Sequence, residues 1–227
     1  MSLSTVEILF QVLAFLFAIS FHESAHAWSA NYLGDPTARM LGRISLNPAR
    51  HIDPVGTILF PMLGAISGAP VFGWAKPCPV DTLKLRHPKR DHVLIAAAGP
   101  VSNFIVAAGA VILLLALRFA STDAAPILSG LTRRGSISLG DSIMGPIIFM
   151  LYSLMFVNVL LAVFNLLPIP PLDGGHILEG LLPTSAQAAF QPFKDYGFLV
   201  LLVLIFYGGL SRVFSPFLTF FHLLLRI

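Results

Sequence analysis

Residues 6–33 read VEILFQVLAFLFAISFHESAHAWSANYL, an apolar run that ends in polar and ionisable side chains. The stretch from Val6 to Phe21 is almost entirely apolar, and a helix that crosses a bilayer needs about 20 such residues. The preceding residues carry no Lys or Arg, whereas a secretory signal peptide has a basic start. We therefore expect a retained membrane-spanning helix.

The whole chain shares this apolar character. Of its 227 residues, 56% are hydrophobic and 11% are charged, whereas soluble domains are about one quarter charged. A soluble enzyme, a disordered chain and a nucleic-acid-binding module are therefore not expected. The excess of 14 Lys and Arg over 11 Asp and Glu is better interpreted as topology information than as a nucleic-acid footprint.

Further apolar runs complete a polytopic pattern, which predicts an all-α membrane protein forming one domain over residues 1–227. The expected core spans are 6–33, 93–120 and 143–167, flanked by one or more spans in 197–225. The last run is interrupted at Gly208–Gly209 and at Ser215–Pro216.

Residues 55–72 are short for a crossing and contain two prolines, so we expect a re-entrant segment. The most basic linkers, 34–54 and 73–92, flank it. A re-entrant segment leaves both linkers on the cytoplasmic side, in accord with the positive-inside rule. Residues 43–47 and 71–76 have β-like character, so they could form a small interfacial β-hairpin. A strand of this hairpin could hold an extended peptide by strand addition.

The first run ends in the pattern H-E-x-x-H, formed by His22, Glu23 and His26. Residues four apart share one face of a helix, so the two imidazoles can bind one zinc ion. Glu23 lies one step round the helix, where it can take a proton from an activated water. The alternative is a pair of interfacial histidines with a snorkelling Glu, but ionisable residues inside apolar helices are costly and usually functional.

A catalytic zinc ion needs a third protein ligand. Asp173 is the candidate, because it follows Pro168, Pro170 and Pro171 at the end of the run 143–167. These prolines terminate the helix and hold a carboxylate on irregular backbone. From the residues alone, Asp173 could equally cap a short helix over residues 174–182. An even number of crossings after His26 places Asp173 at the same end as the histidines, which again favours a re-entrant 55–72.

Together these motifs resemble the site-2 protease family of intramembrane zinc metalloproteases. Residues 165–174 match its N-x-x-P-x-P-x-L-D-G motif, and residues 99–103 resemble its G-x-x-x-N element. The resemblance implies a three-helix catalytic core and one zinc ion per chain, without PDZ or CBS domains. It also implies a role for each matching residue: His22, His26 and Asp173 as zinc ligands, Glu23 as the general base and Asn165 as a group that holds substrate or the oxyanion.

Gly99 and Asn103 are expected to support the site through close helix packing and a buried amide. The function implied is hydrolysis of peptide bonds in transmembrane segments of membrane-protein substrates, inside the cell membrane and nearer its cytoplasmic side. Two alternatives remain open, a metal transporter and a catalytically silent zinc-binding membrane protein. The sequence leaves the substrate and the oligomeric state unassigned.

Overall fold

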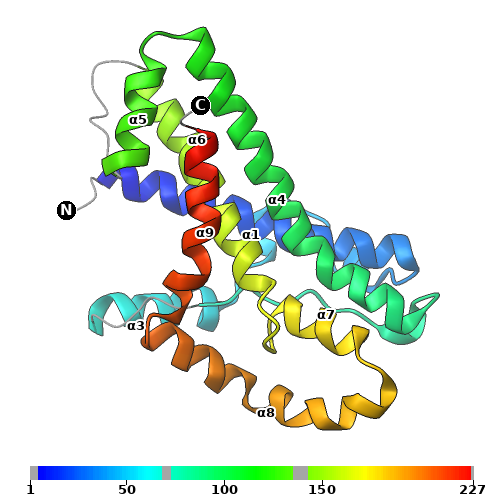
Figure 1. Ribbon diagram of the computed structural model, residues 1–227. Helices are drawn as coiled ribbons and strands as arrows, with labels where there is room; N and C mark the ends of the chain where they lie inside the picture. Colours follow the sequence, from blue (N-terminus) through cyan, green and yellow to red (C-terminus); the bar gives the residue numbers. More distant parts are fainter. Residues whose placement is uncertain (1–4, 68–72, 135–142, 226–227) are drawn as a thin grey trace.

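The computed structural model describes residues 5–67, 73–134 and 143–225 (Figure 1). Three long helices pack pairwise against one another: α1 (Thr5–Leu33), α4 (Pro88–Ala120) and α6 (Met144–Asn165). Alanines at positions 14, 18, 27 and 30 of α1 are fully buried. Small side chains of this kind let helix backbones approach closely, which is how helices associate where the hydrophobic effect is absent.

Four of the described helices are long and apolar enough to cross a membrane. They are Val6–Leu33, Pro88–Ala120, Met144–Asn165 and Ala189–Phe206. Together with the absence of strands from the described residues, these helices confirm the expected all-α polytopic class. The α4 helix begins at Pro88, five residues before the expected start, because its first turn is polar and carries no hydrophobic signal.

Shorter helices complete the bundle at the far end from the H-E-x-x-H motif. α5 (Ala124–Arg134) and α9 (Gly209–Leu224) pack on α6. The cluster they form with α4 and α6 includes the buried side chains Leu114, Leu128, Phe149 and Phe221. This cluster is the main hydrophobic core, and it leaves the opposite end of α1, α4 and α6 free to build a polar site.

The last apolar run forms two helices, α8 (Thr184–Phe206) and α9. The expected interruption at Gly208 is present, and this glycine has a left-handed φ of 69° that favours residues without a Cβ. The expected interruption at Ser215–Pro216 is absent, because α9 continues through Pro216. That proline lies in the eighth position of a helix that has already begun at Gly209, so its missing N–H costs one hydrogen bond without ending the helix.

The described residues on the two sides of 68–72 lie close to one another. The π-helix η2 (Pro54–Leu59) and α3 (Phe60–Ser67) form the outgoing part. The returning chain donates from Trp74 N to Gly56 O over 3.2 Å and from Lys76 N to His51 O over 2.8 Å. Both ends of the segment therefore lie side by side, which supports a re-entrant arrangement, and residues 68–72 fall outside the described part.

The optional β-hairpin is wrong for the residues described. Residues 43–47 and 73–76 contain no strand, and Val71 and Phe72 fall outside the described ranges. The backbone groups of these segments bind elsewhere: Ser45 N donates to Ser24 Oγ on α1, and Lys76 N donates to His51 O. The buried guanidinium of Arg43 then joins the two segments by donating to backbone carbonyls of Arg50, Lys76 and Pro77.

Asp35 fixes the turn that follows α1. Its side chain is fully buried; Oδ1 accepts hydrogen bonds from Thr37, and Oδ2 accepts from the Asp81 backbone N over 2.7 Å. Burial alone would raise the pKa of this carboxyl, but the hydrogen bonds from Thr37 and Asp81 and the charge of Lys84 hold it below its usual value. Asp35 thus ties the end of α1 to the chain that leads into α4.

We expect Asp35→Asn to lower stability at pH 7 by about 1–3 kcal/mol, because an amide N–H₂ replaces one acceptor oxygen and the charge is lost. A carboxyl with a lowered folded-state pKa contributes stability above its unfolded pKa of about 3.9 and loses it as the pH falls. Thermal unfolding in detergent should therefore show a gap between wild type and variant that narrows below about pH 4. Equal melting temperatures at pH 7 would contradict this assignment.

Candidate metal centre

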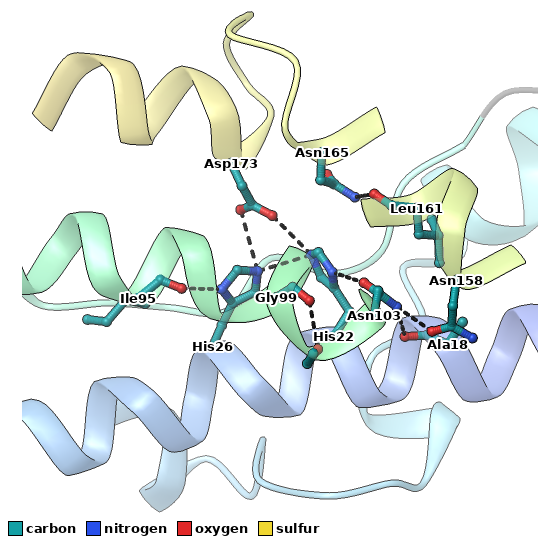
Figure 2. Close-up of polar contacts among 11 residues, drawn as sticks. Ala18, His22, His26, Ile95, Gly99, Asn103, Asn158, Leu161, Asn165 and Asp173 are labelled. Carbon is teal, nitrogen blue, oxygen red and sulfur yellow. Dashed lines mark hydrogen bonds and ion pairs between the residues drawn. The ribbon is translucent and has the colours of Figure 1, made fainter. Parts of the chain in front are cut away.

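The α1 helix places His22 and His26 on one face, inside the bundle. Both imidazoles are buried, and their Nε2 atoms lie 3.1 Å apart (Figure 2). One turn of helix separates the two residues, which is why their side chains converge on one point. Glu23 lies on the same turn and lines the same cavity as the histidines.

Asp173 approaches this pair from the end of α6. After α6 ends at Asn165, the proline-rich stretch turns the chain back, and α7 (Asp173–Leu181) begins at the aspartate itself. The carboxylate lies 3.1 Å from His22 Nε2 through Oδ2 and 3.4 Å from His26 Nε2 through Oδ1. The ligand atoms of the three residues all lie within 4.8 Å of one another. The structure thus brings together the three side chains that the sequence analysis proposed.

Hydrogen bonding on the far side of each ring determines which nitrogen carries the proton. His26 Nδ1 donates to the Ile95 carbonyl over 2.7 Å, and His22 Nδ1 donates to Asn103 Oδ1 over 2.6 Å. A neutral imidazole that donates from Nδ1 has a bare acceptor at Nε2. Both Nε2 lone pairs therefore face the Asp173 carboxylate, whose Oδ2 receives no hydrogen bond from the described residues.

These atoms form a cluster of acceptors without a donor, which fits a cation. Two imidazole nitrogens and one carboxylate oxygen are a known set of metal-binding atoms in catalytic zinc sites, which use three protein ligands and keep one position open. The hydrogen bonds from His22 and His26 to Asn103 and Ile95 are of the kind that orient metal-bound histidines.

Gly99 provides the space in which the two rings sit. A Cβ at this position of α4 would lie 2.4 Å from His26 Nε2 and 2.6 Å from His22 Cε1. Gly174, at the start of α7, is equally constrained, because a Cβ there would lie 2.3 Å from the Leu167 carbonyl oxygen. Both glycines permit close approach of the elements that carry the site.

A cavity of about 640 Å³ opens onto this cluster. Polar and reactive side chains gather on its wall, while α1, α6 and α8 supply apolar ones. The polar and reactive residues are His22, Glu23, His26, Cys78, His92, Asn165, Asp173 and His176. Glu23 and Asn165 therefore share the cavity with the candidate ligands, and the Asn165 Nδ2 donates to the Leu161 carbonyl over 2.9 Å. The roles of general base for Glu23 and oxyanion or substrate holder for Asn165 stay predictions.

Some residues of the site carried no usable signal in the sequence. Asn158 of α6 is fully buried, and its Oδ1 accepts a hydrogen bond from Asn103 Nδ2 over 2.7 Å. His92 of α4 also lines the cavity, where its ring lies 5.5 Å from that of His176. Burial raises the pKa of the Cys78 thiol to about 12, which keeps it protonated.

The fold and the site define a multi-pass membrane protein with a His-His-Asp centre suited to a metal ion. Residues 10–208 match the model of peptidase family M50. This chain therefore belongs to peptidase family M50, the family of site-2 proteases, and is a zinc metalloprotease.

Its relatives carry names of the same kind. The chain is 38% identical over 194 residues to the "Putative zinc metalloprotease YwhC" of Bacillus subtilis, covering 85% of this chain and 78% of the relative. It is 31% identical over 216 residues to the "Putative zinc metalloprotease Rip2" of Mycolicibacterium smegmatis, covering 93% and 73%. The Rip2 protein of Mycobacterium tuberculosis is 30% identical over 194 residues, covering 85% and 65%. No solved structure shows a significant match.

We expect Gly99→Ala to displace the imidazoles and to lower the zinc content of the purified protein, because the new methyl group occupies the position of the His26 ring. Gly109→Ala is the matched control, since a Cβ at that position of α4 meets nothing within 4 Å. Zinc per chain, measured by elemental analysis after dialysis, should fall only in the first variant. Equal zinc in both variants would show that Gly99 does not set the space around the ligands.

Asp173→Ala should reduce bound zinc from about one ion per chain towards none, because two imidazoles leave the ion with too few protein ligands. Asp195→Ala is the control, since this exposed carboxylate accepts a hydrogen bond from Gln191 and is not part of the His-His-Asp group. Full zinc retention by the Asp173 variant, measured in the same way, would remove Asp173 from the ligand set.

Proposed function

We propose that this zinc metalloprotease hydrolyses peptide bonds within membrane-spanning segments of other membrane proteins. The observation that carries the proposal is the composition of the cavity around the metal centre. Its walls include Phe15 and Ile19 of α1, Leu161 and Phe164 of α6, and Phe198 and Leu201 of α8. All three helices contain candidate membrane spans. An apolar cavity between such helices suits an apolar peptide that arrives from the bilayer.

Different residues of the site would have different roles in the reaction. His22, His26 and Asp173 would hold the zinc ion, which supplies a Lewis acid for the scissile carbonyl and for water. Glu23, beside the ligands, would accept a proton from the attacking water and return it to the leaving nitrogen. Asn165, on the cavity wall, would hold the substrate or stabilise the developing negative charge on the carbonyl oxygen.

Segment 73–81, which forms no helix or strand, would provide a place for an unwound substrate. A peptide bond inside a helix is shielded, so a protease must hold its substrate in an extended form. The backbone groups of Trp74 form hydrogen bonds with Gly56 and Thr57, and the backbone N–H of Lys76 donates to His51. Backbone groups alternate in direction along an extended chain, so those of Ala75 would face the other way, towards the cavity that Ala75 lines. This supports strand addition at Ala75.

The distribution of basic residues supports a site nearer the cytoplasmic side. Lys89, in the first turn of α4, donates to the Leu182 carbonyl beyond α7 over 2.6 Å, so the basic linker 73–92 lies beside the elements that carry Asp173. Linker 34–54, which holds three further arginines, follows directly on the helix that carries His22 and His26. Basic loops mark the cytoplasmic side of membrane proteins.

We expect Glu23→Gln to retain zinc and to lose about 10²- to 10⁴-fold in cleavage rate, because the amide cannot accept the proton. The assay uses the purified protein and a reporter with one transmembrane helix in proteoliposomes, and mass spectrometry locates the cut. Wild-type cleavage inside the apolar segment supports the proposal. Cleavage confined to exposed loops would contradict it, and a Glu23→Gln variant as active as wild type would remove Glu23 from its role.

The same vesicles separate the proposal from transport. If the wild type moved zinc across the bilayer without cutting any helix, the His-His-Asp group would be a transit site. If it bound zinc and neither transported it nor cut, the protein would be a silent binder. Both outcomes contradict the proposal.

A further inference from the structure

Two asparagines and a histidine form a hydrogen-bonded chain through the interior of the three-helix bundle (Figure 2). Asn103 of α4 and Asn158 of α6 are both fully buried. Asn103 contacts all three core helices, because it accepts from His22 of α1 and donates to both the Ala18 carbonyl of α1 and Asn158 of α6. Asn158 does not line the cavity. It reaches the candidate ligand His22 only through its hydrogen bond with Asn103.

The direction of each hydrogen bond follows from a backbone carbonyl, which can only accept. Asn158 Nδ2 donates to the Leu154 carbonyl over 2.7 Å, so the other end of that amide, Oδ1, is the end that meets Asn103. Asn103 must therefore present Nδ2 to Asn158, over 2.7 Å, and to the Ala18 carbonyl, over 3.3 Å. Its Oδ1 is then the atom that faces His22. The orientation of one amide thus determines that of the next.

The two histidines differ in how their protons are placed. His26 donates to the Ile95 carbonyl, whose position is set by the α4 backbone. His22 donates to a side-chain amide, which could turn over and present N–H groups instead. If Asn103 turned over, the neutral His22 ring would have to accept at Nδ1 and carry its proton on Nε2, where no cation can bind.

We propose that Asn158 is a positioning residue of the metal centre: it locks the Asn103 amide so that His22 keeps its proton on Nδ1 and presents a bare Nε2 to the ion. A purely structural role is a weaker explanation, because burying an amide in an apolar helix costs free energy unless its hydrogen bonds serve a function. The proposal rests on the His-His-Asp metal centre and not on the nature of the substrate.

The test compares three variants of the full-length chain in detergent. Asn158→Leu fills a similar volume and removes the acceptor for Asn103. In Asn158→Asp, a neutral carboxyl group restores the hydrogen bonds of Asn158. Its O–H can donate to the Leu154 carbonyl while its C=O accepts from Asn103. Met155→Leu, which changes a fully buried apolar side chain of the same helix, is the control for altered packing.

The measurement is zinc affinity, by competition with a chelator and without substrate. Loss of a group that orients a metal ligand typically weakens metal binding about 10- to 100-fold. We expect that loss in Asn158→Leu, near-wild-type binding in Met155→Leu and recovery in Asn158→Asp. Equal affinities for wild type and Asn158→Leu, or equal losses in Asn158→Leu and Met155→Leu, would overturn the proposal. Because no substrate is present, the result is independent of whether the protein cleaves membrane helices.

If Asn158→Leu does not fold, Asn158→Ala removes the same acceptor with a smaller side chain and is expected to give the same loss of zinc affinity.

Discussion

Three groups that can each accept a hydrogen bond or bind a metal face one another at the centre of this protein, and this arrangement suits a cation. Each imidazole is committed on its Nδ1 side, to Asn103 for His22 and to the Ile95 carbonyl for His26. The remaining lone pairs and the Asp173 carboxylate would repel one another in the apolar interior. Much of the local architecture meets this one constraint: Gly99 makes room for the rings, and Gly174 lets α7 begin close enough for its aspartate to reach them.

The proline-rich stretch between α6 and α7 shows how irregular backbone is accommodated at the edge of a membrane bundle. Unsatisfied N–H groups are the main cost of leaving a helix in an apolar environment. Proline has no N–H, so residues 168, 170 and 171 present none. Ile169 N donates to the Leu167 carbonyl and Leu172 N to the Ile169 carbonyl. The donors between the two helices are thus removed or bonded locally, and the chain can turn sharply enough to bring Asp173 back to α1.

Features with a local cause were predictable from the sequence, and features that depend on tertiary partners were not. The spacing of His22 and His26 fixes a shared helix face by itself, and Gly208 interrupts the last run through its own backbone freedom. The strand expected near residues 71–76 fails because partner choice belongs to the tertiary fold, where Lys76 binds His51 instead of residues 43–47. Asn158 is one of a few polar residues in an apolar run, and only its hydrogen bond with Asn103 in the folded protein indicates a role for it.

The depth of the centre connects these constraints to the proposed activity. His26 lies seven residues before the end of α1 at Leu33, which is about 10 Å of helix at 1.5 Å per residue. Its partner Ile95 lies seven residues after the start of α4 at Pro88, at a similar depth. A bilayer core is about 30 Å thick, so the centre lies near one end of the bundle. Water then has a short path to the site, which the proposed hydrolysis requires.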